Sequence, residues 1–142
     1  MPEKPHILVA DDERSIRLTL EAGLSVKGFR VTSVRSGREA LEAARQTRFD
    51  AVVSDIYMPN GDGLEVVREL RGGISPQIPI ILITAQGSVE IAVRAVAEGV
   101  SDFIAKPFEI AELATLLHRH LRGRKEKTSK FLNDEPVALE DF

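Results

Sequence analysis

The fold of this chain is decided by the stretch Asp50-Ala-Val-Val-Ser-Asp-Ile-Tyr-Met-Pro-Asn-Gly-Asp-Gly63. A short apolar run ends at Ser54 and Asp55, and proline and glycine follow, which is typical of a buried strand that leads into a loop. In an α/β protein, a carboxylate at the C-terminal end of such a strand lies where open parallel sheets bind ligands. Asp55 is therefore a candidate functional residue. The alternative is an aspartate that only caps a helix or a turn.

The composition indicates one globular domain with a tail and excludes several classes of protein. The chain has 142 residues, 43% of them hydrophobic and 29% charged, with a net charge of −3, so it carries no overall basic surface for nucleic acid. Cysteine is absent, which excludes disulfides, thiol catalysis and cysteine metal sites. No apolar run approaches the roughly 18 residues of a membrane span, and the first residues do not resemble a secretory signal. We therefore expect a cytoplasmic protein without a membrane association.

A strand followed by a helix recurs five times along the chain. The predicted strands are Ile7–Ala10, Phe29–Val34, Ala51–Asp55, Ile80–Ile83 and Phe103–Ala105. The predicted helices cover residues Ile16–Val26, a segment that Ser36 opens, Leu64–Leu70, about Ser88–Glu98 and about Ile110–Leu121. Ser36 and Glu39 have the spacing of a capping box, and glycines follow several of the helices. This alternation predicts a doubly wound, five-stranded parallel sheet with five helices and the flavodoxin-like strand order 2-1-3-4-5.

Polar residues follow every predicted strand except the second, which lies at an edge. They are Asp11, Asp12, Asp55, Thr84 and Lys106. The C-terminal ends of parallel strands lie side by side, so we expect a cluster in which three carboxylates raise one another's pKa. Mg2+ with oxygen ligands would relieve that conflict, and a carboxylate held beside it can attack phosphorus to form an acyl phosphate. The alternative is a structural Asp–Lys salt bridge at the mouth of the sheet.

Four segments together resemble the receiver domain of bacterial two-component response regulators. These segments are Val9-Ala-Asp-Asp-Glu13, Ser54-Asp-Ile-Tyr-Met-Pro59 with Gly61-Asp-Gly63, Thr84-Ala85, and Asp102-Phe-Ile-Ala-Lys-Pro-Phe108. The resemblance covers residues 7 to about 121 in the order and spacing of that family. It implies a receiver domain over residues 5–122 and a linker or tail over residues 123–142.

The resemblance assigns roles around the aspartate. Asp55 would be phosphorylated by a partner histidine kinase. Asp12 would bind Mg2+ directly, Asp11 would bind it directly or through water, and the backbone carbonyl of Tyr57 would complete the protein ligands. Tyr57 and Gln86 occupy the two positions that vary in the family and tune the lifetime of the phosphoryl group.

The resemblance also implies a switch. Thr84 and Lys106 would bind the phosphoryl group, and Phe103 matches the aromatic residue that rotates inward as the threonine moves toward phosphate. The alternative for Phe103 is an ordinary core residue. The Lys106–Pro107 peptide matches a bond that is usually cis in the family, although proline alone gives cis a low expectation.

The segment from Thr84 to Phe108 is similar to receivers of the sigma-54-dependent, NtrC-type transcriptional activators, in which an ATPase domain and a helix-turn-helix domain follow the receiver. No Walker-type glycine-rich loop occurs here, so we expect the output domain to be absent from this chain. Residues Arg119–Lys130 carry six basic residues and one acidic residue. Without aromatic interleaving they favour a solvated linker over a nucleic-acid site, and we expect no direct nucleic-acid binding by this domain.

The expected function is a phosphorylation-activated signalling switch rather than an enzyme. It would dimerise through its fourth helix, fifth strand and fifth helix, with exposed ion-pairing residues at Arg94, Glu98, Asp102 and Arg119. One alternative is a stand-alone receiver in a phosphorelay or a phosphate sink without DNA output. Another is a metal-dependent phosphohydrolase with an aspartyl intermediate. That enzyme would need an acidic residue two positions after the nucleophile, where this chain has Tyr57.

Overall fold

Five parallel strands form one sheet in the order β2-β1-β3-β4-β5, as predicted. The computed structural model describes residues 3–85 and 89–123. The strands are β1 (His6–Ala10), β2 (Arg30–Val34), β3 (Ala51–Asp55), β4 (Ile80–Thr84) and β5 (Asp102–Ala105). Strands β1 and β3 are neighbours although β2 lies between them in the chain, so their C-terminal ends form the point where the strand order reverses.

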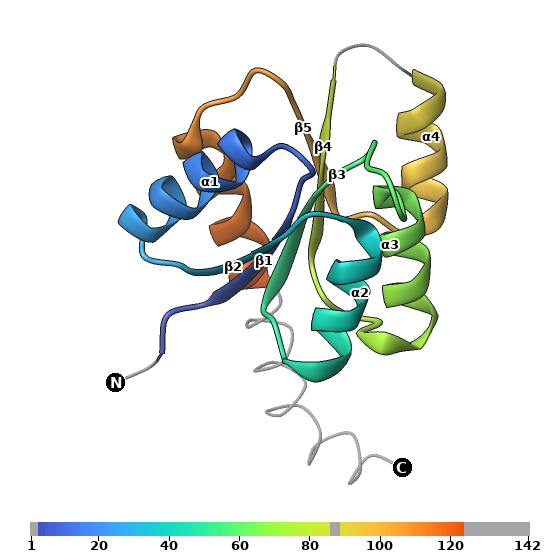
Figure 1. Ribbon diagram of the computed structural model, residues 1–142, viewed down its shortest axis with the longest axis horizontal. Helices are drawn as coiled ribbons and strands as arrows, with labels where there is room; N and C mark the ends of the chain where they lie inside the picture. The colour runs from blue at the N-terminus through green and yellow to red at the C-terminus, as the bar shows by residue number, and fades with distance from the viewer. Residues whose placement is uncertain (1–2, 86–88, 124–142) are drawn as a thin grey trace, which may run out of the picture.

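Helices cover both faces of this sheet (Figure 1). They are α1 (Arg14–Val26), α2 (Gly37–Gln46), α3 (Gly63–Glu69), α4 (Val89–Glu98) and a C-terminal helix over residues 110–123. Helix α1 and the C-terminal helix lie on one face, and α2, α3 and α4 lie on the other. The α-helical part of the third helix ends at Glu69, and a π-type turn, η1 (Leu70–Ile74), follows it, in which the backbone of Gly73 is not helical. The amide of Ser75 closes that turn on the carbonyl of Leu70 at 3.0 Å.

The core has two layers because successive strand residues point to opposite faces of the sheet. Ile7, Val9, Val53 and Ile83 pack against α1 and the C-terminal helix. The residues between them in sequence, such as Leu8 and Leu82, pack against the three helices on the other face. Burial on both faces explains why the central strands read as continuous apolar runs in the sequence.

The first turn of α2 has a partner for each of its backbone amides. Ser36 Oγ accepts from the amide of Glu39 at 3.2 Å, as the capping box predicts, whereas the Glu39 carboxylate accepts from the amide of Arg35 at 2.9 Å rather than from Ser36. The amides of Gly37 and Arg38 donate to the carbonyls of Gly61 and Asn60, at 2.9 and 3.0 Å. A Cβ at Gly37 would collide with the Gly61 carbonyl. Glycine is therefore required where the loop after β3 meets the start of α2.

Arg71 in η1 joins three segments at the opposite end of the sheet from Asp55. Its guanidinium donates to the carbonyls of Gly99 at 2.8 Å, Ile78 at 2.6 Å and Pro76 at 3.1 Å, and to Ser101 Oγ at 3.3 Å. Ser101 Oγ in turn accepts from the amide of Ile80 at 2.9 Å. Burial lowers the pKa of Arg71. One side chain thus satisfies backbone carbonyls of the loop before β4 and the turn between α4 and β5.

Several predictions fall on residues that the structure does not describe. Gln86, Ser88 at the predicted start of the fourth helix, and the tail 124–142 lie outside the described ranges. Gly123, which the sequence assigns to the tail, still belongs to the C-terminal helix. Within residues 3–85 and 89–123, no helix combines the length and apolar character needed to cross a bilayer.

Candidate functional site

The C-terminal ends of β1, β3, β4 and β5 bring the predicted polar residues to one edge of the sheet. Asp11 follows β1, while Asp55 and Thr84 are the last residues of β3 and β4. Asp55 is in register with Ile83, so Thr84 lies one residue further along the neighbouring strand. The amide of Lys106, which follows β5, donates to the Thr84 carbonyl at 2.8 Å. The parallel topology therefore gathers residues that are up to 95 positions apart in the sequence.

Three carboxylates form the centre of this edge. Asp11, Asp12 and Asp55 each offer an oxygen within 4.8 Å of the others. Asp11 has no exposed surface and Asp55 is 7% exposed, whereas Asp12 is exposed to solvent. Asp11 Oδ1 accepts from the amide of Glu13 at 2.9 Å. Asp11 Oδ2 is buried and has no hydrogen-bond partner among the described residues, which is costly for a polar atom unless a further group satisfies it.

Lys106 supplies a positive charge among these carboxylates. Its Nζ lies 3.2 Å from Asp55 Oδ2, with which it forms a hydrogen bond, and 3.8 Å from Asp11 Oδ2. Burial lowers the pKa of the Lys106 ammonium, but the Asp55 and Asp11 carboxylates together raise it by more, so the net shift is upward. Lys106 is therefore protonated throughout the physiological pH range.

The single positive charge of Lys106 does not neutralise the negative charges of the three carboxylates. Burial raises the pKa of Asp11, and the neighbouring Asp55 and Asp12 carboxylates add to this effect. The Glu13 amide and Lys106 act in the opposite direction without cancelling it. The ionised form of Asp11 is thus disfavoured in the folded protein until another cation joins the cluster.

The geometry of this edge agrees with the sequence family that the chain matches. The family model described as "Response regulator receiver domain" matches residues 7–118, which is most of the chain and includes all five predicted residues of the cluster. The chain belongs to this family.

Two curated relatives of this receiver domain are longer proteins. Response regulator MprA of Mycolicibacterium vanbaalenii is 42% identical over 143 residues, which cover 94% of this chain and 62% of that protein. Transcriptional regulatory protein PrrA of Mycobacterium leprae is 40% identical over 120 residues, which cover 84% of this chain and 51% of that protein. The chain therefore spans between half and two thirds of the length of these relatives.

Solved structures show the same fold in two different contexts. NtrX from Brucella abortus, solved in complex with ADP, superposes with a TM-score of 0.82 at 32% identity, covering 89% of this chain and 29% of that chain. The receiver domain of a signal transduction histidine kinase from Syntrophus aciditrophicus superposes with a TM-score of 0.78 at 35% identity, covering 84% and 91%. Similar folds thus occur both within a much longer chain and in the receiver domain of a histidine kinase.

The donor set of this receiver domain fits Mg2+. The cluster offers only oxygen ligands, and the unpartnered Asp11 Oδ2 lies within it. A hard cation with several retained waters would satisfy that oxygen and offset the carboxylate repulsion. The Tyr57 carbonyl, which the resemblance adds to the ligands, is in no hydrogen bond with the described part of the chain.

The sequence reasoning missed Arg17, which holds the backbone of the acidic cluster. Its Nη1 donates to the carbonyl of Asp11 at 2.8 Å. A signal was present, because Arg14 and Arg17 lie in the first turn of α1, where the helix dipole disfavours cations. A cation at that position indicates a compensating acceptor nearby, and here the acceptor is the backbone carbonyl of Asp11.

Three further predicted features, at Phe103, Tyr57 and the Lys106–Pro107 peptide, lie in the described part of the chain. Phe103 is half-buried and packs against the core layer that α2, α3 and α4 cover. The Tyr57 side chain is 61% exposed. The Lys106–Pro107 peptide is cis, as the resemblance implies.

The prediction that Glu98 and Asp102 are exposed is wrong. Both are half-buried, because each has a partner within the chain: Glu98 pairs with Arg68 at 3.2 Å and Asp102 with His120 at 3.0 Å. Arg94 and Arg119 are exposed, and neither forms an ion pair with the described residues.

Proposed function

We propose that this receiver domain is a signalling switch that accepts a phosphoryl group on Asp55 from a sensor histidine kinase. The observation that carries the proposal is the cluster of three carboxylates, with Lys106 on Asp55 and one buried Asp11 oxygen that has no hydrogen-bond partner among the described residues. A structural salt bridge would account for Lys106 and Asp55. It would not account for a buried Asp11 oxygen that reaches Lys106 only at 3.8 Å and makes no hydrogen bond with the described residues, or for the third carboxylate.

Each residue of the cluster has its own role in the proposed phosphoryl transfer. A carboxylate oxygen of Asp55 attacks the phosphorus atom of the donor's phosphohistidine, and the bond between that phosphorus and the histidine nitrogen breaks with its electron pair on nitrogen. When bound by Asp11, Asp12, Asp55 and the Tyr57 carbonyl, Mg2+ supplies charge neutralisation for the phosphoryl oxygens. The Lys106 ammonium, already in contact with Asp55, neutralises a further oxygen, and the Thr84 hydroxyl donates to another. The phosphoryl group ends on the protein, so we class the chain as a switch rather than an enzyme.

The test is phosphorylation by acetyl phosphate with Mg2+. The wild-type chain is expected to gain the mass of one phosphoryl group, and Asp55→Asn is expected to gain none. Asp50→Asn, at the opposite end of β3, is the matched control and is expected to be modified like the wild type. Equal modification of Asp55→Asn and wild type would overturn the assignment of the phosphoacceptor.

Tyr57→Asn is expected to shorten the lifetime of the phosphorylated protein several-fold. The Tyr57 side chain lies two residues after Asp55 and is exposed beside the site, so its ring can exclude water from the acyl phosphate. The decay of phosphorylated protein after removal of the donor measures this effect. Tyr57→Phe keeps the ring and is expected to decay like the wild type. An equal or slower decay of Tyr57→Asn would show that the ring does not shield the phosphoryl group. Gln86, the other proposed lifetime residue, is tested in the same assay.

The proposed readout is a population shift between two arrangements of Thr84 and Phe103. Phosphate would favour the arrangement in which Thr84 approaches the phosphoryl group and Phe103 turns inward from its half-buried position. The face of α4, β5 and the C-terminal helix would then pair with a second receiver. Val93 and Val96 of α4 are 61% and 63% exposed, which offers apolar surface for such a contact.

We propose a transcription-regulating output domain, because PrrA is described as a transcriptional regulatory protein and is longer than this chain. The sigma-54-dependent type, with an ATPase domain, is supported by NtrX, whose longer chain was solved with ADP. The length of any further domain in the same protein discriminates the two, since PrrA has roughly as much chain again and NtrX has more than twice as much. The receiver itself would act in the cytoplasm without contacting DNA or membrane.

A phosphorelay role is the second candidate. The similar receiver domain from Syntrophus aciditrophicus belongs to a histidine kinase, so receivers of this kind also occur without a transcription output. Transfer of the phosphoryl group from Asp55 to a histidine of a second protein, measured with the phosphorylated chain, would favour this reading.

A further inference from the structure

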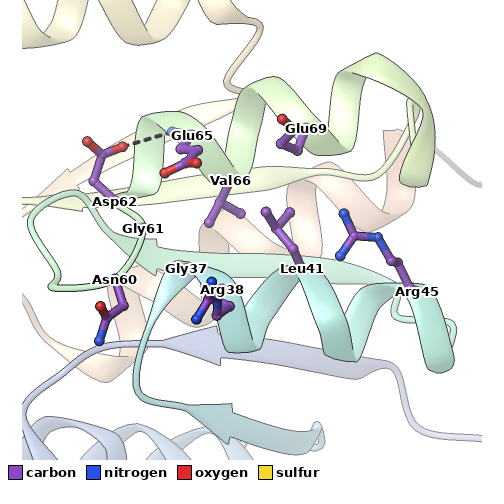
Figure 2. A pocket seen from close by; sticks show the side chains of 10 residues that line it. All are labelled: Gly37, Arg38, Leu41, Arg45, Asn60, Gly61, Asp62, Glu65, Val66 and Glu69. Atoms are coloured by element: carbon purple, nitrogen blue, oxygen red, sulfur yellow. Dashed lines mark hydrogen bonds between the residues drawn. The ribbon is translucent and has the colours of Figure 1, made fainter.

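A charged groove runs between α2 and α3, apart from the acidic cluster (Figure 2). It encloses about 470 Å³. Its α2 wall is formed by Gly37, Arg38, Leu41 and Arg45, and its other wall by Asp62, Glu65, Val66 and Glu69, with Asn60 and Gly61 at one end. Nothing in the proposed phosphoryl chemistry uses these side chains.

The two walls carry opposite charges that are not neutralised across the groove. Arg38 and Arg45 lie on α2, one after the other along the groove, and Glu65 and Glu69 lie on α3 (Figure 2). All four side chains are exposed, and none forms an ion pair or side-chain hydrogen bond with residues 3–85 or 89–123. The neighbouring Arg68 and Arg35, in contrast, pair with Glu98 and Glu39.

This pattern restricts the kind of partner that the groove fits. A partner of uniform charge, such as a nucleic acid or a strongly basic peptide, would be attracted by one wall and repelled by the other. The floor offers little apolar area, because Leu41 is 8% exposed and Val66 is fully buried. A suitable partner therefore presents an acidic and a basic stripe side by side, at the spacing of these two helices.

We propose that the partner is a second copy of this chain. In a twofold dimer the same patch meets itself, so each wall must be the complement of the other. A twofold axis along the groove places α2 of one copy over α3 of the second, with both helices running in the same direction. Figure 2 shows Arg38 across from Glu65, and Arg45 toward the Glu69 end. This operation therefore sets Arg38 against Glu65 of the second copy, and Arg45 against its Glu69.

The glycines at one end of the groove allow this approach. Gly37 and Gly61 have no side chains, and the Gly61 carbonyl is already occupied by the Gly37 amide. The Gly37 amide and the Gly61 carbonyl therefore need no partner from a second copy. Exposed ion pairs are individually weak, so the dimer is expected to be weak and to depend strongly on salt.

Sedimentation velocity on the unphosphorylated full chain tests the proposal at about 0.01 M and about 0.15 M salt, where the Debye length is about 30 Å and about 8 Å. The dimer is expected at the lower salt concentration, with association at least tenfold weaker at the higher one. Arg38→Glu/Arg45→Glu and Glu65→Arg/Glu69→Arg are each expected to be monomeric alone. An equimolar mixture of the two variants is expected to restore the dimer.

The restored mixture separates a specific contact from a folding defect, because misfolded variants would not recover association on mixing. If either double variant fails to fold by circular dichroism, Arg45→Glu and Glu69→Arg replace the pair. Val93→Lys/Val96→Lys on α4 is the matched control and is expected to leave this dimer unchanged. The proposal is overturned if the wild type is monomeric at both salt concentrations, if charge reversal leaves association intact, or if the α4 control abolishes it. Loss of phosphorylation in Asp55→Asn has no bearing on these outcomes, so the two proposals fail independently.

Discussion

Replacing Asp11 by asparagine is expected to stabilise the metal-free protein and to abolish its stabilisation by Mg2+. The Asp11 side chain is buried, its Oδ2 has no hydrogen-bond partner among the described residues, and the Asp55 carboxylate lies beside it. Asparagine keeps the size of the side chain and the Oδ1 acceptor for the Glu13 amide, but it removes the charge. We expect a gain of about 1 to 2 kcal/mol in the free energy of unfolding at neutral pH without metal.

The pH dependence of this gain has a defined sign. Burial, with the neighbouring carboxylates, raises the pKa of folded Asp11 above its ordinary value of 3.8. The folded state therefore binds the Asp11 proton more tightly than the unfolded state does. The contribution of Asp11 to the stability of metal-free wild type falls as pH rises from 3.8 through the folded pKa, and it then stays level. The advantage of Asp11→Asn is expected to be absent below this window and complete above it.

Urea unfolding between acidic and neutral pH, with EDTA or with Mg2+, measures both effects. Mg2+ at about 100 times its dissociation constant would stabilise the wild type by about 2.7 kcal/mol. Asp11→Asn is expected to gain almost nothing, so the order of stability reverses when metal is added. Asp50→Asn is the control for replacement of a carboxylate on the same sheet. An Asp11→Asn protein that is less stable than wild type in EDTA would contradict the charge conflict described for the site.

Replacing Arg71 by alanine is expected to destabilise the protein by about 3 kcal/mol, a large part of the stability of a domain of this size. Its guanidinium satisfies the carbonyls of Gly99, Ile78 and Pro76 and the hydroxyl of Ser101. Alanine leaves these acceptors without their donor and separates η1 from the turn before β5. Lysine cannot span four acceptors from one point charge, so Arg71→Lys is expected to recover only part of the loss.

Arg68→Ala is the matched control for this prediction. Arg68 lies three residues earlier, and its partner is the side chain of Glu98 in a more exposed ion pair. Exposed pairs contribute little, so Arg68→Ala is expected to lower the urea midpoint far less than Arg71→Ala. Similar midpoints for the two variants would show that the backbone contacts of Arg71 do not carry the stability assigned to them.

The strand order and the edge of the sheet that carries the acidic cluster could be predicted because both follow from repeated local patterns. The continuous apolar runs at Ile7–Ala10 and Ile80–Ile83 indicate strands covered on both faces, and parallel strands place their C-terminal residues together. Asp11, Asp55, Thr84 and Lys106 could therefore be assigned to one site without coordinates. Helix ends were less predictable. Gly72 and Gly73 predict the end of the third helix, and the backbone does leave the helical region at Gly73, but the α-helix already gives way to a π-type turn at Leu70.

Long-range side-chain partners could not be predicted from local patterns. In the sequence, Arg17 and Arg71 cannot be told from ordinary surface arginines. Only the folded chain shows that each one donates to backbone carbonyls. The same limit explains the error at Glu98 and Asp102, whose partners Arg68 and His120 come from other elements. Charge in a sequence indicates that a side chain needs a partner, but the fold decides which partner it finds.

Hydrogen exchange at the start of α2 can be used to follow the loop after β3, because hydrogen bonds join the two segments. The amides of Gly37 and Arg38 are protected only by the carbonyls of Gly61 and Asn60, a few residues beyond Asp55. Most helices are capped by their own flanking side chains, so their ends fray independently of other elements. Here the first two amides of the helix exchange with solvent only when the loop after β3 moves away from them. Their hydrogen-exchange rates therefore report the position of that loop directly, without any label on the site itself.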